Sequence, residues 1–423
     1  MPQIKEALKD FNPWWENKFR IEFKERRIYR KIQKFMTLRQ IIALVGLRRV
    51  GKTTLMLKII EDAIKNGLDS RSIIYFSFDE FREVEIREVI RAYEEIMEKN
   101  FRNDKYLLLL DEIQKLNNWE DQIKVVYDTF RNVKIILSGS ESLFIRKKSK
   151  ETLAGRIFEF KIEPLSFREF LLFKEFDFEP IGLHERELHK LFNEFALTLG
   201  FPELVGIQEK EIIKKYINEG IIEKVIYRDL TKLFKIKDVS LIESLLRIFM
   251  EEPGQIVELS ELANELNISR QTLSNYLDYL EESFLIRKLY NFSKSRRKVE
   301  RKLKKYYPTI VSVDLLFRGD DVSKSKVFEW QIVNQLNAEY FWRDPYKNEV
   351  DIVLINKKLI PIEVKYGKID FKGLTVFMKK FTANEGYIIT PDKEGTQKIN
   401  GKIISIVPAF KFLLKREKSE YRV

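Results

Sequence analysis

Between about residues 39 and 165, short apolar runs alternate with stretches whose apolar positions recur at helical spacing. Runs of five or six apolar residues bounded by polar ones are typical of buried strands. The predicted strands are Ile41–Val45, Ile73–Phe78, Tyr106–Leu110 and Val133–Leu137. Because helical stretches separate them, we expect a parallel sheet in an α/β domain.

The rest of the chain has other patterns. At ~150 residues per domain, 423 residues suggest about three domains. Residues 166–245 have a helical pattern, broken at Gly200-Phe201-Pro202, and 246–318 predict a small helical module followed by a strand or two. Helix and strand mix around Val350–Ile355 and Ile360–Val364. We therefore predict five segments, with bounds at 1–35, 36–165, 166–245, 246–318 and 319–423.

Composition narrows the chemistry. The chain has no Cys and only two His, His184 and His189, which excludes disulfides and thiolate sites and argues against histidine-rich metal centres. The net charge of +12 favours a polyanionic partner. The apolar runs are too short to span a bilayer and the N-terminus is charged, so we expect a cytoplasmic protein without a membrane partner. The 34% of charged residues and the absence of Cys resemble proteins of heat-loving organisms.

A phosphate-binding motif follows the first predicted strand directly. Residues Gly46–Thr53 fit G-x-x-x-x-G-K-[ST] and open an apolar-periodic helix near Thr54. Backbone N–H groups at such a turn form an anion nest at a helix N-terminus. Lys52 would reach the β- and γ-phosphates of ATP, and Thr53 would ligate Mg²⁺. The predicted nucleotide-binding residues are Gly46, Leu47, Arg48, Arg49, Val50, Gly51, Lys52, Thr53 and Thr54.

A pair of acids ends the third predicted strand. Asp111 and Glu112 follow Tyr106–Leu110, about 60 residues after the P-loop. A carboxylate at the carboxyl end of a parallel strand lies beside the phosphate crevice. We expect Asp111 to hold the Mg²⁺ water shell and Glu112 to deprotonate the attacking water.

Two further residues are candidates for the same reaction. Ser138 ends the next strand, where its hydroxyl would sense the γ-phosphate; turn chemistry is the alternative. Arg156 would act in trans as an arginine finger, which predicts a ring or other homo-oligomer. A structural ion pair is the alternative for Arg156.

Several segments together resemble a family of archaeal and bacterial AAA-type P-loop ATPases. They are GLRRVGKTTL, LLLLDEIQ, LSGSES, LAGR and PLSFREFL, and the Asn12-Pro13-Trp14-Trp15 segment resembles its archaeal members. The resemblance implies an ATPase core with a helical lid, then a winged helix, then a C-terminal α/β domain related to restriction endonucleases. For Trp14-Trp15 we expect packing against the ATPase core.

The segment Glu258–Leu289 predicts a helix-turn-helix. One helix covers Leu259–Leu266, Asn267-Ile268-Ser269 supplies the turn with Ser269 as N-cap, and a recognition helix covers Arg270–Glu282, before a first wing strand at Phe284–Leu289. Protein–protein contact is the alternative to DNA contact, since Asp278, Glu281 and Glu282 repel phosphate. The residues expected to face outward toward DNA are Arg270, Gln271, Thr272, Asn275 and Tyr276.

A basic run follows this module. Ten Lys/Arg and one acid lie between Leu285 and Lys305, with Tyr290, Phe292, Tyr306 and Tyr307 interleaved or flanking. Concentrated charge of this kind is typical of a phosphate-backbone contact, and a solvated hairpin is the alternative. The predicted DNA-binding cations are Arg296, Arg297, Lys298, Arg301 and Lys302.

A C-terminal hairpin brings carboxylates together. If it folds about Lys357, Asp351 lies opposite Glu363, with Cβ atoms about 5 Å apart. Facing carboxylates favour a cation between them, and Lys365 lies on the same strand face as Glu363. The sequence therefore predicts an Asp, a Glu and a Lys converging on one point.

This constellation resembles the core of the restriction-endonuclease superfamily. Glu329 matches the acid that this superfamily often places on a preceding helix. The resemblance implies phosphodiester hydrolysis in which Asp351 and Glu363 bind Mg²⁺, Glu329 is a possible further ligand and Lys365 positions the water. A domain that keeps these residues but only binds its partner is the alternative.

These features together predict an ATP-hydrolysing enzyme that acts on DNA, with ATP and Mg²⁺ as cofactors. The alternatives are a nucleotide-dependent switch or scaffold with protein partners and an inert nuclease-like domain, and a translocating motor with an inert tail.

Overall fold

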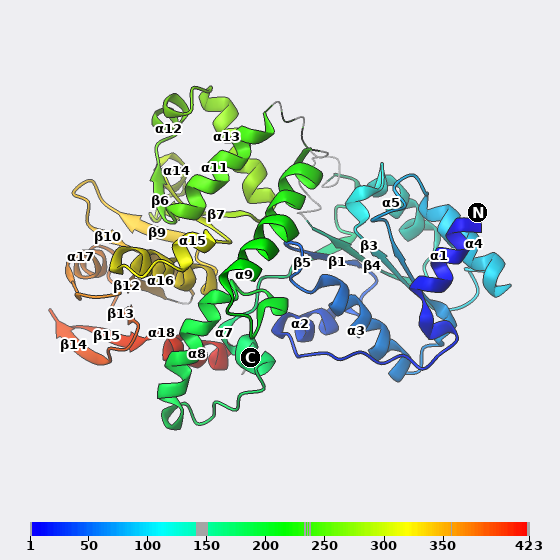
Figure 1. The fold of residues 1–423 in the computed structure, drawn as a ribbon, viewed down its shortest axis with the longest axis horizontal. Coiled ribbons are helices and arrows are strands. Elements are labelled where there is room, and N and C mark those ends of the chain that lie inside the picture. The colour runs from blue at the N-terminus through cyan, green and yellow to red at the C-terminus, as the bar shows by residue number, and fades with distance from the viewer. Residues whose placement is uncertain are drawn as a thin grey trace. The chain divides into compact units, whose positions relative to one another are not determined.

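The computed structural model describes residues 2–140, 151–231, 234, 236, 238–356 and 358–420, with side chains up to 416. Lys357 and the last two residues of LSGSES, 141 and 142, lie outside the described residues. The chain divides into two compact units, Met1–Glu163 and Pro164–Val423 (Figure 1). The division lies two residues before the predicted end of the ATPase core at 165.

The first unit is a parallel five-stranded sheet with helices on its faces. The strand order is β2-β3-β4-β1-β5, and Figure 1 shows α5 on one side of the sheet and α2 and α3 on the other. Its elements are α1 (Pro2–Phe11), η1 (Pro13–Trp15), α2 (Arg27–Phe35), β1 (Ile41–Val45), α3 (Lys52–Lys65), η2 (Ser70–Ser72), β2 (Ile73–Ser77), α4 (Ile86–Met97), β3 (Tyr106–Asp111), η3 (Ile113–Lys115), α5 (Trp119–Thr129), β4 (Val133–Gly139) and β5 (Ile157–Lys161).

The four predicted strands are confirmed as β1 to β4, within two residues at their ends. The sequence pattern missed β5, because this edge strand is only partly buried and alternates polar with apolar residues. Both indole N–H groups of Trp14 and Trp15 donate to the Ile73 carbonyl, at 3.1 and 2.8 Å. The predicted packing of Trp14-Trp15 against the ATPase core is therefore confirmed.

The second unit begins with helices, as the pattern over 166–245 predicts. Gly200 has φ +78°, and a Cβ there would lie 2.6 Å from Pro164 Cβ, so glycine is required at the predicted break. The elements before the second sheet are α7 (Phe167–Phe173), η4 (Ile181–Leu183), α8 (Glu185–Leu197), η5 (Pro202–Leu204), α9 (Lys210–Ile217), the π-helical turns η6 (Asn218–Ile222) and η7 (Lys224–Leu230), and α11 (Val239–Glu251).

The second sheet joins strands from two of the predicted segments. Its order is β10-β9-β7-β8-β6, and β9 pairs in parallel with β7 across the predicted boundary at 318. The segments 246–318 and 319–423 are thus continuous through backbone hydrogen bonds. The elements are β6 (Gln255–Val257), α12 (Leu259–Glu265), α13 (Arg270–Glu282), β7 (Ile286–Asn291), α14 (Arg296–Arg301), β8 (Lys304–Pro308), α15 (Val313–Leu316), α16 (Asp321–Gln335), β9 (Tyr340–Arg343) and β10 (Glu349–Val350).

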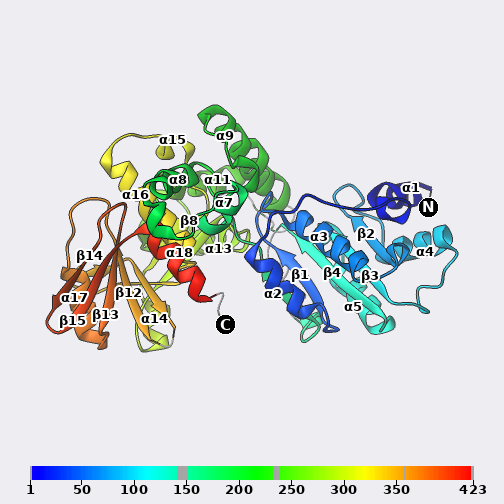
Figure 2. The same ribbon diagram turned by 90° about the horizontal axis from the view of Figure 1, so that it is seen from below.

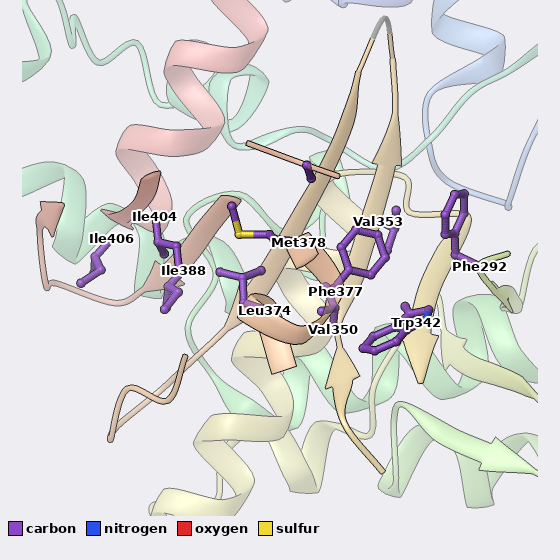
Figure 3. Close-up of a cluster of buried hydrophobic side chains, with 11 residues drawn as sticks. Phe292, Trp342, Val350, Val353, Leu374, Phe377, Met378, Ile388, Ile404 and Ile406 are labelled. Atoms are coloured by element: carbon purple, nitrogen blue, oxygen red, sulfur yellow. The ribbon is translucent and has the colours of Figure 1, made fainter. Parts of the chain in front are cut away.

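A third sheet ends the chain, with strand order β11-β12-β13-β15-β14 (Figure 2). Helix α17 packs on it through Leu374, Phe377 and Met378, which contact Val353, Ile388 and Ile404 in one buried cluster (Figure 3). The elements are β11 (Ile352–Ile355), β12 (Leu359–Val364), α17 (Lys372–Phe381), β13 (Glu385–Thr390), β14 (Gly395–Ile399), β15 (Lys402–Pro408) and α18 (Ala409–Glu420). No helix in the described part of the chain has both the length and the apolar character needed to cross a membrane.

Candidate functional site

The predicted P-loop connects β1 to α3 in the first unit. Gly46 and Gly51 have φ of +151° and +96°, and a Cβ on Gly46 would lie 2.4 Å from the Ile162 carbonyl oxygen. Both positions therefore require glycine. The Lys52 ammonium is folded onto its own loop and donates to the carbonyls of Gly46 and Leu47, at 2.9 Å each.

The structure brings the predicted P-loop and strand-end residues together. The Thr53 hydroxyl donates to Asp111 Oδ2 at 2.8 Å, so the two expected Mg²⁺-site residues are in direct contact. This hydroxyl–carboxylate pair beside Lys52 and a helix N-terminus suits a Mg²⁺–nucleotide phosphate.

Asp111 is 4% exposed, and each of its oxygens accepts more than one hydrogen bond. Oδ2 also accepts from the Tyr75 hydroxyl at 2.7 Å, and Oδ1 accepts from the Glu112 N–H at 3.0 Å and from the Ser138 hydroxyl. Burial, followed by the charge of Asp111, raises the pKa of Tyr75, which keeps the phenol a donor. Ser138 is fully buried. Its hydroxyl therefore helps to position Asp111. The predicted role of Ser138 as a γ-phosphate sensor stays a prediction.

Glu112 occupies the strand end with φ +53°. Gln114 Nε2 donates to Glu112 Oε2 at 2.6 Å and to the Ser140 hydroxyl at 3.0 Å, and Lys115 Nζ lies 3.8 Å from the same carboxylate. These contacts orient the carboxylate of Glu112, the expected base. Neither Tyr75 nor Gln114 was expected from the sequence, because nothing in a local motif shows which neighbouring side chains reach an acid.

Arg26 is a further residue that sequence reasoning missed. It is 5% exposed, and its guanidinium donates to the carbonyls of Val50, at 2.9 Å, and Glu163, at 2.7 Å. Arg26 therefore ties the P-loop to the chain that follows β5. Its position in a run of Lys, Glu and Arg residues gave no signal for this role.

Arg156 forms an ion pair within the first unit. Its Nε and Nη2 lie 3.2 and 3.4 Å from the two carboxylate oxygens of Asp128. Both partners are about a third exposed or more, so a pair of this kind contributes little stability. The arginine-finger role stays a prediction.

The C-terminal hairpin has the predicted register. Ile352 pairs with Ile362 and Ile355 with Leu359, which sets Asp351 opposite Glu363. Lys365 Nζ lies 2.8 Å from Glu363 Oε1, and the Val364 N–H donates to Asp351 Oδ2 at 2.8 Å. The three residues converge as expected.

A fourth predicted residue, Glu329 on α16, joins them through a lysine that was not expected. Lys305 on β8 is 5% exposed, and its Nζ lies 2.9 Å from both Glu329 Oε1 and Glu349 Oε1, and 3.8 Å from Asp351 Oδ1. The Tyr307 hydroxyl also donates to Glu329. The ammonium of Lys305 thus lies among three of the carboxylates.

The charged groups of this cluster shift one another's pKa values. Burial, then the charge of Glu329, raises the pKa of Asp351 to about 6. Burial, then Asp351, raises the pKa of Glu363 to about 8, and Glu363 Oε2 is buried without a hydrogen-bond partner. Burial alone would lower the pKa of Lys305, but the surrounding carboxylates raise it well above its usual value. The surrounding carboxylates therefore favour the charged form of Lys305.

A second cation does not fit the cluster as it stands. In the described part of the chain, no group of three or more His, Cys, Asp or Glu side chains is placed to hold a metal ion. A divalent ion beside Asp351 and Glu329 would meet the Lys305 ammonium at close range, and like charges repel strongly at low dielectric. The residue types suit Mg²⁺, but Lys305 lies among the carboxylates that Mg²⁺ would need.

The helix-turn-helix segment has the predicted elements. Ser269 caps α13 by accepting from the Thr272 N–H at 3.0 Å, and α13 has the predicted bounds, while the strand after it is Ile286–Asn291 rather than Phe284–Leu289. Arg270 and Gln271 are exposed, and Gln271 Nε2 donates to Asn275 Oδ1 at 2.9 Å. The outward orientation expected for Tyr276 is wrong. It is 5% exposed because it lies on the apolar face of α13, with Leu273, Leu277 and Leu280.

The basic run is divided between several environments. Arg296, Arg297, Lys298 and Arg301 are exposed on α14, but Lys302 donates to Asn291 Oδ1 at 3.2 Å and to the Phe292 carbonyl at 3.3 Å. Lys288 lies 2.5 Å from Glu281 and 3.8 Å from Asp278. It therefore neutralises acids of α13 that would repel phosphate.

Comparison with known families shows which family the region around the P-loop resembles. Residues 38–171 match the family model of an AAA domain. This part of the chain is a P-loop AAA-type domain. Residues 189–309 and 327–412 match two families described only as domains of unknown function, DUF8612 and DUF4143. The AAA-type domain contains all the nucleotide-site residues discussed above except Arg26, and Lys305 lies in a different family segment from the carboxylates that it contacts.

Two related proteins match over most of their length, and a third matches over a shorter part. An uncharacterized protein of Methanocaldococcus jannaschii is 28% identical over 411 residues, covering 87% of this chain and 83% of that protein. A second one from the same organism is 29% identical over 432 residues, with 92% of each covered. An uncharacterized protein of Haemophilus influenzae is 30% identical over 249 residues, covering 57% of this chain and 60% of that protein.

Among solved structures, the chain is similar to Hsp104 of S. cerevisiae in its ADP complex, with TM-score 0.33, 12% identity, and 78% of this chain and 45% of that chain covered. It is also similar to AMPPCP-bound DnaA from Aquifex aeolicus, with TM-score 0.27, 18% identity, and 62% and 90% covered. The assignment of the AAA-type domain rests on the family match.

Replacing Arg26 tests its support of the P-loop. We expect Arg26→Ala to weaken ATP binding about tenfold, or ~1.4 kcal/mol, because the carbonyls of Val50 and Glu163 lose their donor. Titration calorimetry with a non-hydrolysable ATP analogue measures the change. Lys31→Ala, an exposed residue on α2, is the control. Equal affinities for Arg26→Ala and the control would show that the loop holds its shape without Arg26.

Proposed function

We propose that this chain is an ATP-hydrolysing AAA-type ATPase that acts on DNA, and that its C-terminal domain binds DNA without cutting it while Lys305 stays in place. The observation that carries the proposal is the convergence of Lys52, Thr53 and Asp111 in the AAA-type domain. A lysine, a hydroxyl and a carboxylate at a helix N-terminus are the groups that ATP hydrolysis needs around the phosphates.

The residues of this site have distinct roles in the proposed reaction. The N–H groups of the loop bind the phosphates, and Lys52 leaves the carbonyls of Gly46 and Leu47 to neutralise the β- and γ-phosphates. When bound by Thr53 and Asp111, Mg²⁺ supplies positive charge for the phosphate oxygens. Glu112, oriented by Gln114, accepts the proton of the attacking water.

The helix and strand order of the second unit supports DNA contact. The elements α11, β6, α12, α13, β7 and β8 follow one another as in a winged helix, with α14 between the last two strands. Arg270 and Gln271 begin α13 and are exposed, as a recognition helix requires. The exposed cations of α14 supply phosphate contacts next to it.

The contacts of Lys305 favour binding over cleavage in the restriction-endonuclease-like domain. Glu329, Asp351, Glu363 and Lys365 keep the residue types of a nuclease. The Lys305 ammonium already pairs with Glu329 and lies 3.8 Å from Asp351, so a metal ion at these carboxylates would have to displace it. The proposal thus combines an active ATPase with the inert nuclease-like domain that the sequence analysis gave as an alternative.

Assembly is the second part of the proposal. AAA-type cores place an arginine finger at a subunit boundary, and Arg156 is the candidate. Its pair with Asp128 is partly exposed, so the guanidinium is available to a neighbouring copy at small cost. A ring or other homo-oligomer follows from that role.

Two substitutions separate nucleotide binding from hydrolysis. Lys52→Ala removes the cation that meets the phosphates, so we expect loss of ATP binding. Glu112→Gln keeps the hydrogen-bonding shape but removes the base, so we expect binding near the parent affinity with turnover reduced about 100-fold or more. Nucleotide titration and phosphate release measure both. Turnover of Glu112→Gln at the parent rate would contradict the assignment of the base.

Removing the Lys305 charge tests the carboxylate site. We expect Lys305→Met to lower the thermal midpoint in EDTA, because Glu329, Glu349 and Asp351 lose their cation and repel one another. Added Mn²⁺ should restore part of the midpoint and bind measurably by calorimetry without nucleotide. Lys368→Met, at an exposed site, is the control. Mn²⁺ binding by the parent chain at Asp351, abolished by Asp351→Ala, would show that Lys305 does not exclude a metal.

DNA action is tested by turnover and binding together. We expect DNA to increase ATP hydrolysis, and DNA affinity to fall steeply with salt. Labelled single-stranded, duplex and branched DNA are incubated with Mg²⁺ or Mn²⁺, with and without ATP. Cleavage by the parent chain that Asp351→Ala abolishes would contradict binding without cleavage and show that this domain is a nuclease. DNA binding no stronger than background, together with tight retention of ADP, would favour the alternative of a nucleotide-dependent switch or scaffold.

A further inference from the structure

The second unit contains a cleft of about 960 Å³ whose lining is rich in cations. Seven Lys/Arg and three Asp/Glu side chains line it, contributed by α12 and the residue before it, the segment between β7 and β8, the end of β9 with the turn after it, and α17. The volume lies near the upper end of the ~300–1,000 Å³ range of small-ligand pockets, but such pockets are mostly apolar. This cleft has the charge of a polyanion site instead.

Only part of this charge belongs to the basic run expected from the sequence. Lys298, Arg301 and Lys302 line the cleft, whereas Arg296 and Arg297 do not. Arg343, Lys347 and Lys380 also line the cleft; they belong to the C-terminal segment and were not among the cations predicted to bind DNA. Cations of two predicted segments therefore face the same space.

The cations in the cleft have few carboxylate partners. Within the described part of the chain, Lys298, Lys347 and Lys380 make no ion pair, while Arg343 Nη1 lies 3.5 Å from Glu349. Burial, then repulsion by Lys380 and Lys298, lowers the pKa of Lys302. Like charges held close together without counter-charges are stabilised by a bound anion.

The acids of the lining are mostly engaged elsewhere. Glu258 caps α12 by accepting from the Glu261 N–H at 2.8 Å. Asp344 accepts from the N–H groups of Tyr346 and Asn348, at 2.9 Å each, within the β9–β10 turn. These N–H groups stabilise the two carboxylates, and seven Lys/Arg against three Asp/Glu still leave the lining with an excess of positive charge.

The two walls are fixed to each other. Asn291 is buried on β7, donates to the Arg343 carbonyl at 3.0 Å and accepts from the Arg343 N–H at 3.2 Å and from Lys302. Phe292 and Trp342 belong to the buried cluster of Figure 3 and also line the cleft. Phe292 packs on Phe381 with ring centroids 5.1 Å apart. A ligand would thus meet a preformed site and order little of it on binding.

We propose that this cleft, between α14 and the β9–β10 turn, binds the phosphate backbone of DNA through Lys298, Arg301, Lys302, Arg343, Lys347 and Lys380. This rests on the proposed action on DNA and adds the place where the backbone lies. The exposed start of α13, with Arg270 and Gln271, is not part of the lining, so it is a separate surface. The cleft contributes affinity without base readout, because its cations contact phosphates.

Adjacent lysines on α17 provide a matched test. Lys380 lines the cleft and Lys379 does not, and both are exposed at the same helix end. DNA binding of the full chain is measured by fluorescence anisotropy over a salt series, with labelled oligothymidylate and a labelled duplex. We expect Lys347→Gln and Lys380→Gln each to weaken binding and to reduce the slope of log affinity against log salt by about one, equally for different sequences. Lys379→Gln should match the parent.

The outcomes separate this inference from the proposed function. If the parent binds DNA and both cleft variants bind as well as Lys379→Gln, the cleft inference is wrong and action on DNA stands through α13. If the parent shows no salt-dependent DNA binding, the proposed function is wrong as well. Binding of polyglutamate, or of phosphatidylserine vesicles, as tightly as DNA would overturn the assignment to nucleic acid. Unchanged thermal midpoints of the variants show that these exposed substitutions leave the fold intact.

Discussion

The second unit is organised around a buried ammonium. Lys305 reaches from β8 to Glu329 on α16, Glu349 on β10 and Asp351 beside β11, so elements of two sheets and a helix share one cation. An unpaired buried charge is costly, and therefore each partner holds the others in place. The same arrangement bears on the proposed chemistry, because the ammonium already lies beside Glu329 and Asp351, where a metal ion would bind. One side chain thus joins these elements, and it is also the basis of the proposed binding without cleavage.

The AAA-type domain depends on a comparable polar centre with a different outcome. Asp111 is buried, but its partners Thr53, Tyr75 and Ser138 are neutral donors, so its charge is oriented without being neutralised. A carboxylate of this kind keeps its attraction for a cation. In the Lys305 cluster, by contrast, a positive side chain meets the carboxylates directly. Under the proposed function, the Asp111 site therefore binds Mg²⁺ and the Lys305 cluster does not.

The basic charge of the chain is organised by the sheet that β7 and β9 share. Pairing of Tyr290 with Tyr340 and of Asn291 with Phe341 fixes the two walls of the cleft through the backbone. Lys302 then lies near enough to Lys298 and Lys380 to feel their charge, and this repulsion is what the proposed anion would relieve. The same charges spread over a flexible hairpin would bind phosphate with a larger loss of entropy.

The sequence by itself determined the features that depend on neighbours along the chain. The strands β1 to β4, the P-loop glycines, the Ser269 cap and the hairpin register that opposes Asp351 and Glu363 all follow from local pattern, because strand burial, positive φ and a two-residue period are local properties. The inward side of α13 was harder to read, and Tyr276 was placed on the wrong face because a tyrosine suits either a wet or a buried position.

Only the tertiary structure decided which distant side chains meet. Arg26 lies 24 residues from Val50, Lys305 lies 44 residues from Glu349, and Lys380 joins Lys298 in one cleft through the packing of α17. Lysine and arginine are common on surfaces, and their long side chains reach partners that no spacing rule identifies. The sequence shows which residues are charged, but only the fold decides which groups each charge contacts. Electrostatic interaction depends on distance and burial rather than on order along the chain.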